Sequence, residues 1–276
     1  MIRPRHGSIL PGFRLATGYA MSYLGLLVLL PLAAVGATAT SEGLAGFWSE
    51  VSKDRTIAAY RLSILGALSA AAINAVFGFV VAWTLARYRF PGRGLLDALV
   101  DLPLALPTAV AGIALTAVYS KDHLLGRVLV DAGIGVAYTN TGVLMAMLLV
   151  SLPFSVRIAM PVIEDLESEL EEAAASLGAS AWTTFRRVVL PIVLPAILTG
   201  FALSFAKAVG EYGSIIFISS NMPGRSEIAP LLIMTRLEEN DEHAAASVAI
   251  GLLLLSLVVL VTVNLLQTRW QRRHAG

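Results

Sequence analysis

The sequence predicts an all-α membrane protein with about six transmembrane helices. Of its 276 residues, 57% are hydrophobic and only 14% are charged, whereas a soluble domain has roughly a quarter of its residues charged because its surface faces water. Each expected span is about as long as the ~20-residue helix that crosses a bilayer core. The six spans follow from long stretches without charge, at 15–41, 62–86, 102–120, 132–156, 188–206 and 244–268.

The first span shares two features with a signal peptide. Basic residues precede it, and Ala37-Thr38-Ala39 imitates a cleavage site. The apolar run at 19–35 is long for a signal peptide, however, and further spans follow. We therefore expect a retained first helix, with processing within residues 1–39 as the alternative. The expected spans lie near 17–38, 63–86, 98–118, 141–162, 192–218 and 245–267.

Basic residues set the expected orientation, because positively charged loops resist translocation. The two tails and the loops at 87–96 and 163–191 together carry 11 lysines and arginines, whereas the segments on the other side carry 7. An even number of spans agrees with this asymmetry. Both termini are therefore expected to be cytoplasmic.

The third span contains Pro103 and Pro107. Proline removes a backbone donor and its ring clashes with the preceding turn, so we expect a kinked or unwound helix. The hydroxyl of Thr108 could bind a carbonyl freed by the kink. Near the cytoplasmic end of this span, Asp97 and Asp101 are expected to pair with basic residues of the preceding loop. These residues are Arg87, Arg89 and Arg93.

Two basic residues fall within expected spans, Arg157 in the fourth and Lys207 near the middle of the fifth. An ionisable residue at such depth is costly to insert and is a functional candidate by default. Arg157 is a candidate anion contact, with snorkelling to the interface as the commoner alternative. Lys207 either contacts an anion or pairs with Glu211, four residues later on the same helix face. Two helix-breaking glycines and the hydroxyl of Ser214 follow.

The loop between the fourth and fifth spans is acidic and amphipathic. Residues 161–172 read PVIEDLESELEE and contain six carboxylates. Gly178 suits a left-handed cap at the C-terminus of a helix. Apolar residues at intervals of three and four predict an amphipathic helix in this segment, which would end near Gly178. They are Ile163, Leu166, Leu170, Ala173, Ala174 and Leu177.

A second short helix is expected at 181–189. Ser180 is a suitable N-cap, Trp182 and Phe185 share one side, and Pro191 is expected to end the helix just before the membrane. Loops that only connect two elements are usually shorter than this one. A docking surface for a cytosolic partner is therefore favoured over a plain connection.

The same loop resembles the EAA motif of ABC importer permeases, E-A-A-x3-G-x9-I-x-L-P. It matches at 172–174, at Gly178 and at 188–191, with Val188 in place of isoleucine as the single departure. The resemblance implies a type I ABC importer permease fold and two coupling helices that seat in a groove of an ATPase subunit. The residues expected to take part in coupling are Glu172, Ala173, Ala174, Gly178, Ser180, Trp182, Leu190 and Pro191.

Two further stretches, 88–117 and 205–237, resemble sulfate/thiosulfate permeases of the CysT type, and the similarity extends over about 60–267. CysW-type and molybdate permeases share part of these patterns, but 213–218 with 221–223 looks more like CysT. The resemblance implies import of sulfate or thiosulfate, with molybdate or another oxyanion as the alternative. The candidate translocation path consists of Lys207, Glu211, Ser214, Thr108 and Arg157.

ATP hydrolysis must come from a partner, because the sequence has no G-x-x-x-x-G-K-[ST] phosphate loop. The resemblance implies two cytosolic ABC ATPase subunits, which would bind ATP and magnesium, and a periplasmic sulfate- or thiosulfate-binding protein. It also implies a second permease subunit, either of the CysW type or a second copy of this chain. The expected location is the bacterial inner membrane. Net charge is +1, with no cysteine and four scattered histidines, so neither a nucleic-acid partner nor a metal site is expected.

Two other functional classes remain as alternatives. In an ion-coupled secondary carrier, Lys207 and Glu211 would form the coupling site. A membrane enzyme would need a catalytic cluster at a common depth, and none is visible, so a non-catalytic subunit is expected.

The chain divides into a cytoplasmic tail, a first helix with its periplasmic loop, a permease core that contains the coupling loop 163–191, and a second cytoplasmic tail. An apolar run within 219–243 is too short to span and is expected to form an interfacial or re-entrant helix. The four segments are 1–16, 17–59, 60–267 and 268–276.

Overall fold

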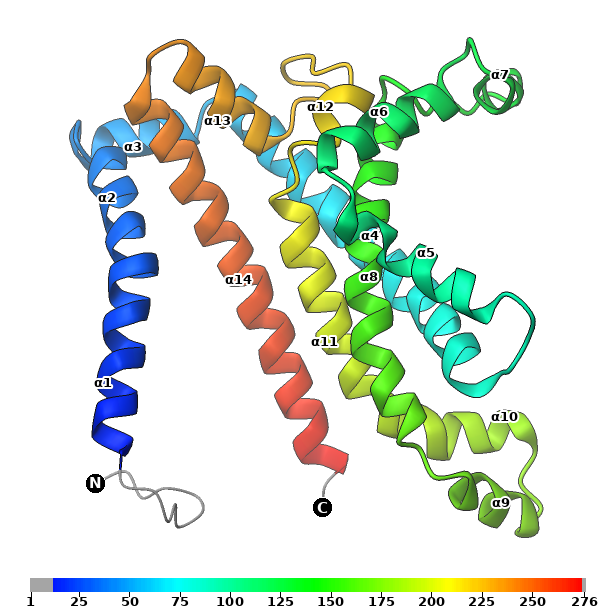
Figure 1. Cartoon of the computed structure of the whole chain (residues 1–276). Coiled ribbons are helices and arrows are strands. Elements are labelled where there is room, and N and C mark those ends of the chain that lie inside the picture. Colours follow the sequence, from blue (N-terminus) through cyan, green and yellow to red (C-terminus); the bar gives the residue numbers. More distant parts are fainter. Residues whose placement is uncertain (1–11, 275–276) are drawn as a thin grey trace.

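A computed structural model describes residues 12–274, which form helices and no strand (Figure 1). Most of the predicted N-terminal tail and the last two residues lie outside this range. Five helical segments are long and apolar enough to cross a membrane, and a sixth is bent. The prediction of about six spans is therefore confirmed. The five are Leu15–Ala39, Asp54–Arg87, Asn140–Glu164, Ala181–Val209 and Glu242–Thr268.

The first and fifth spans are each assembled from more than one helical piece. The first comprises α1 (Phe13–Leu24), the π-helical turn η1 (Gly25–Leu29) and α2 (Leu30–Ala39). The fifth comprises α10 (Ala181–Thr184), the π-helical turn η2 (Phe185–Val189) and α11 (Leu190–Val209). The second, fourth and sixth are single helices, namely α4 (Asp54–Arg87), α8 (Asn140–Glu164) and α14 (Glu242–His274).

The core forms where α4, α8 and α11 pack together. Ser155 of α8 lies between two glycines: a Cβ on Gly78 would lie 2.8 Å from its Cβ, and a Cβ on Gly200 would lie 3.1 Å from its Cα. Its Oγ also shares a hydrogen bond of 2.8 Å with the Oγ of Ser204. Small residues and hydroxyls hold helices together where lipid offers no hydrophobic driving force. The three helices therefore pack closely against one another.

The third span is broken. It consists of α5 (Arg93–Ala105) and α6 (Thr108–Tyr119), which meet at an angle of 116°. The predicted kink or unwinding is confirmed at Pro107, whereas Pro103 lies inside α5 without breaking it. Pro107 cannot donate the backbone hydrogen bond that would continue α5, so the chain leaves the helix there.

The fifth span ends at Val209, and the predicted extension to 218 was wrong. Residues 210–214 are not helical, and a short α12 (Ile215–Ile218) follows them. Hydropathy continues across the break because 215–218 is apolar. The break itself follows from Gly210 and from a side chain, Glu211, that binds the backbone of Ser214 in place of a helical carbonyl.

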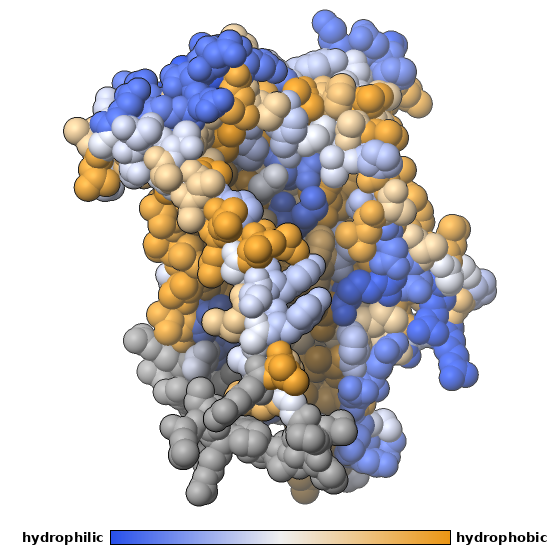
Figure 2. Space-filling view, turned by 60° about the vertical axis from the view of Figure 1, so that its left-hand side comes forward, coloured by the Kyte–Doolittle hydropathy of each residue, from blue (hydrophilic) through white to orange (hydrophobic). Residues whose placement is uncertain are grey.

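The remaining helices lie at the two ends of the molecule (Figure 1). At one end lie α12, α3 (Gly43–Val51), α7 (Leu124–Asp131) and α13 (Ala229–Glu238). At the other lie α9 (Ser168–Ser176) and α10, together with the start of α1 and the end of α14. At ten residues, α13 is too short to span, in line with the helix expected in that loop. Figure 2 shows hydrophilic side chains gathered at the upper end and hydrophobic ones over much of the middle.

Candidate functional site

The loop between α8 and α11 projects from the end of the spans (Figure 1). One continuous helix from residue 161 was wrong: α8 continues to Glu164, and α9 begins at Ser168. Ile163 and Leu166 face the core and are buried, whereas Leu177 is 89% exposed. The predicted apolar stripe therefore divides between the core and an outward surface.

Gly178 ends α9 in the left-handed conformation that the sequence predicted, with φ +81°. The amide of Gly178 donates to the carbonyl of Ala175 at 2.9 Å, and the amide of Ala179 donates to that of Ala174 at 3.0 Å. This pair of bonds is a Schellman cap, which satisfies the last carbonyls of the helix. No atom lies within 4 Å of where a Cβ would project from Gly178. The turn is therefore open to an approaching surface.

Ser180 caps the second helix as predicted, because its Oγ accepts from the amide of Thr183 at 3.3 Å. The prediction that Pro191 ends this helix was wrong, since α10, η2 and α11 run on as one helix of 29 residues. In η2 the amide of Leu190 donates to the carbonyl of Phe185, five residues earlier. The wider π-helical turn places a proline in the helix without the usual clash with the preceding turn.

The outward face of the loop carries exposed apolar side chains as well as carboxylates. Trp182 is 68% exposed and Leu177 is 89% exposed, although both are large hydrophobic residues. Glu172 and Ala173 of the EAA-like segment are also exposed, and Ala174 is partly so. Contiguous exposed apolar patches are a typical feature of interaction sites, and these side chains lie at the end of the molecule that carries α9 and α10.

An aromatic and ionic tether joins this loop to α4. Trp182 stacks on Phe185, with ring centroids 5.7 Å apart, and Phe185 packs against Trp83 at 6.4 Å. Arg87 lies over the ring of Trp83 at 5.4 Å and forms a salt bridge with Glu171 of α9. These contacts connect α9 and α10 directly to α4.

Sequence reasoning missed this tether, although a signal for it exists. Phe79, Trp83 and Arg87 recur at intervals of four and so share one face of α4. Phe79 also contacts Phe185, with ring centroids 6.2 Å apart. The spacing marks the face but not its partner, which lies about 100 residues later in the chain.

A second candidate site lies where α11 ends. Lys207 is in the last turn of α11, not near the middle of a span as predicted. Its Nζ donates to Glu211 Oε2 at 2.9 Å, so the pair that was one of the two alternatives is present, although Glu211 lies beyond the helix. Glu211 Oε1 accepts from the amide and the Oγ of Ser214 at 3.1 and 3.0 Å. Glu211 is buried, with its side chain 2% exposed, whereas that of Lys207 is 35% exposed.

One face of α6 packs against this unwound segment. A Cβ on Gly213 would lie 2.2 Å from Thr108 Oγ1, and a Cβ on Gly112 would lie 2.2 Å from the carbonyl oxygen of Ser214. Thr116 Oγ1 donates to the carbonyl of Phe217 at 3.1 Å. The two breaks, in the third and the fifth span, therefore meet. Among residues 12–274 no hydrogen bond joins Thr108 Oγ1 to a freed carbonyl.

Arg157 belongs to a separate cluster. The expected pairing of Asp97 and Asp101 with Arg87, Arg89 or Arg93 was wrong, because both carboxylates bind Arg157. Its Nη1 donates to Asp97 Oδ1 at 2.7 Å and its Nε to Asp101 Oδ1 at 2.8 Å. These bonds fasten α5 to α8. Two carboxylates on one guanidinium leave no net positive charge for an anion.

Comparison with known proteins shows to which family the chain belongs. Residues 74–274 match the family described as "Binding-protein-dependent transport system inner membrane component". The chain belongs to this family. It is 45% identical over 268 residues to the sulfate transport system permease protein CysT of Salmonella typhimurium, covering 97% of each chain. It is 48% identical over 254 residues to CysT of Synechocystis sp., covering 92% of this chain and 88% of the relative.

Two solved structures share the fold of this family member. A bacterial ABC transporter that imports the acidic polysaccharide alginate has a chain that matches with a TM-score of 0.72 and 14% identity, covering 93% of this chain and 95% of its own. The same class of transporter, in complex with an alginate-bound periplasmic protein, matches with a TM-score of 0.69 and 18% identity. The chain is thus a multi-pass membrane protein with an ABC importer permease fold.

Proposed function

We propose that this permease translocates sulfate or thiosulfate across the bacterial inner membrane as one subunit of an ATP-driven importer. The observation that carries the proposal is 45% identity to a CysT sulfate permease over 97% of both chains. The matched region covers nearly the whole of both chains. The match to alginate importers supports the fold and not the cargo.

The subunit is non-catalytic and takes its energy from two cytosolic ATPase subunits that bind ATP and magnesium. The loop 163–191 is their docking surface, because it presents exposed Trp182 and Leu177 at the end of the molecule that carries α9 and α10. Gly178 lets the partner surface approach closely at a turn that has no side chain. The tether through Phe185 and Arg87 then carries the movement of the ATPase into α4. Both termini lie on the same, cytoplasmic side.

A second permease of the CysW type and a periplasmic binding protein complete the complex. The first span has an apolar window of which no residue is buried within this chain. Its side chains can be covered by lipid or by another permease subunit. The end that carries α13 faces the periplasm, where a binding protein would deliver the anion.

The anion passes the junction of the two broken spans. Broken helices at membrane depth are tolerated where they line a cavity or a path. Within the Lys207–Glu211 pair the carboxylate is buried and the ammonium is partly exposed, so a passing dianion meets the positive partner. Thr108 and Ser214 supply hydroxyls at the same junction, and Arg157, already neutralised, fastens α5 to α8 instead.

Uptake of radiolabelled sulfate by cells that lack their own sulfate permease tests the proposal. Cells that express the chain with its partner subunits should take up sulfate, and thiosulfate should compete. Uptake should persist when an uncoupler collapses the proton gradient and stop when ATP is depleted. The reverse pattern would indicate an ion-coupled carrier, and competition by molybdate but not thiosulfate would assign another oxyanion.

A further inference from the structure

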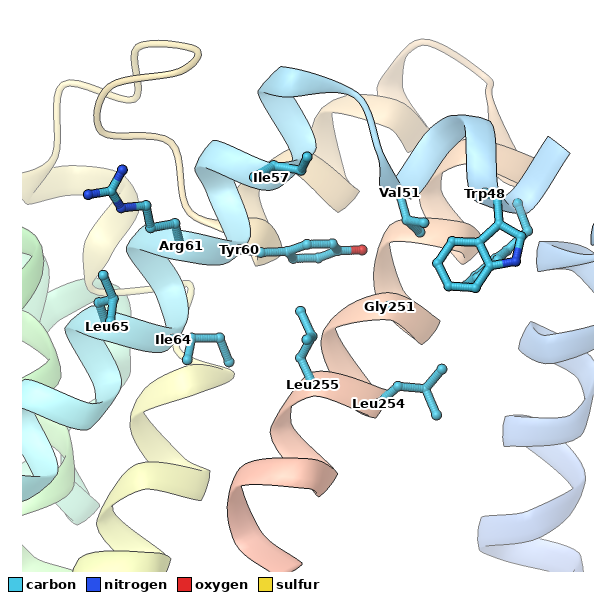
Figure 3. A pocket seen from close by; sticks show the side chains of 11 residues that line it. Trp48, Val51, Ile57, Tyr60, Arg61, Ile64, Leu65, Gly251, Leu254 and Leu255 are labelled. Atoms are coloured by element: carbon cyan, nitrogen blue, oxygen red, sulfur yellow. The ribbon is translucent and has the colours of Figure 1, made fainter. Parts of the chain in front are cut away.

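A groove lies between α3, α4 and α14, near the end of the molecule that carries α13 (Figure 3). It encloses about 560 Å³, within the range of roughly 300–1,000 Å³ typical of small-molecule sites. A Cβ on Gly251 would lie 2.1 Å from Tyr60 Oη, so α14 approaches α4 closely there. The apolar walls are formed chiefly by Trp48, Val51, Ile64, Leu65, Leu254 and Leu255.

Arg61 is the one charged residue that lines this groove. It lies at the α4 edge, and its guanidinium points away from the apolar centre (Figure 3). In the described part of the chain Arg61 forms no salt bridge. By contrast, the basic residues that precede it are paired, Lys53 with Glu50 and Arg55 with Glu227. An arginine on a membrane-facing surface is costly unless it reaches water or an anion.

The position of Arg61 fits the boundary between headgroups and hydrocarbon. It lies seven residues after Asp54, the first residue of α4, which corresponds to about 10 Å of helix rise. The headgroup layer on each side of a bilayer is of that order of thickness. Trp48, which is 64% exposed, lies on the same groove, and tryptophan is enriched at this boundary.

An apolar slot, an exposed tryptophan and a guanidinium without a salt bridge in the described residues together match a phospholipid. We propose that the groove binds one anionic phospholipid, with an acyl chain between α4 and α14 and the phosphate beside Arg61. This site is separate from the coupling loop and from the junction at Lys207, and it does not depend on the identity of the cargo.

Native mass spectrometry of the full-length chain, purified with its partner subunits, tests the site. Phosphatidylglycerol or phosphatidylcholine is added at matched concentrations, and the bound lipid is counted. Phosphatidylglycerol should be retained preferentially, and Arg61→Gln should weaken its retention about fivefold, as expected for the loss of one cation near a lipid headgroup. Leu254→Trp should fill the slot and lower retention of both lipids.

Arg127→Gln is the matched control, because Arg127 is an exposed arginine on α7 that lines no part of the groove. Equal loss in Arg127→Gln, or no loss in Arg61→Gln, would overturn the proposal. The chain has no cysteine, so Leu254→Cys introduces a single thiol. Efficient cross-linking of that thiol to a second permease subunit would show that protein covers the groove, which would also overturn the proposal.

Discussion

Lys207 and Glu211 form an ion pair that joins the last turn of α11 to the unwound segment after it. The carboxylate has three bonds, to the ammonium and to the amide and hydroxyl of Ser214. Because Glu211 is buried, the pair holds the segment in place as well as balancing a charge. The structural and the transport role of Lys207 can therefore be separated only by changing both partners.

Lys207→Met should reduce both the amount of inserted protein and sulfate uptake. Removing one partner of a buried pair costs about 3 kcal/mol, at the lower end of the usual range because Lys207 is partly exposed. The double variant Lys207→Met/Glu211→Gln removes the unpaired charge and should restore the protein level but not uptake. Immunoblots of membranes and uptake assays measure the two effects. Normal uptake in the double variant would give Lys207 a purely structural role.

Gly178→Glu should abolish uptake while the protein still inserts. The side chain would project into the open side of the turn and block an approaching ATPase surface. Gly178→Ala is the matched control, because it brings the left-handed strain of about 1 kcal/mol without the bulk. It should retain most uptake and ATPase stimulation. Wild-type transport by the glutamate variant would remove the coupling role from this turn.

Arg87→Gln should uncouple ATP hydrolysis from transport. It removes the salt bridge to Glu171 and the contact over Trp83, each worth about 0.5–1 kcal/mol. In proteoliposomes, ATPase activity should persist while uptake per ATP falls severalfold. Arg186→Gln changes an exposed arginine of the same loop outside the tether and should leave the ratio unchanged. If uptake per ATP were equal in the two variants, the ATPase would have to move α4 through contacts other than this tether.

Arg157→Met should destabilise the packing of α5 on α8, because it leaves Asp97 and Asp101 facing each other without a cation. Asp101→Asn leaves a balanced pair of Arg157 and Asp97 and should be tolerated. Thermal melting in detergent should place Arg157→Met below the wild type and Asp101→Asn close to it. If Asp101→Asn melted at a lower temperature than Arg157→Met, the net negative charge of this cluster would be required for stability.

Local sequence signals predicted much of this structure. Charge-free stretches located the spans, since a helix in lipid must be apolar along its length. Gly178 and Ser180 predicted the turn of the coupling loop because caps depend on single residues. The break at Pro107 followed for the same reason.

What the sequence did not predict depends on contacts between distant residues. Arg157 lies 56 residues from Asp101, and only the packing of α5 on α8 brings them together. The end of α11 at Val209 depends on hydrogen bonds accepted by the side chain of Glu211. A hydropathy profile does not detect such bonds. The tether from Arg87 to Glu171 spans 84 residues and requires the loop to fold back onto α4.

The most direct test is labelling of residue 177, which asks whether the loop 163–191 is the cytoplasmic surface on which an ATPase docks. Leu177→Cys places the single thiol of the chain on the exposed tip of α9. A membrane-impermeant maleimide should label it in inside-out vesicles stripped of ATPase, fail to label it in intact cells, and be blocked when the ATPase is restored. Labelling from outside intact cells would place the loop in the periplasm and contradict the coupling role.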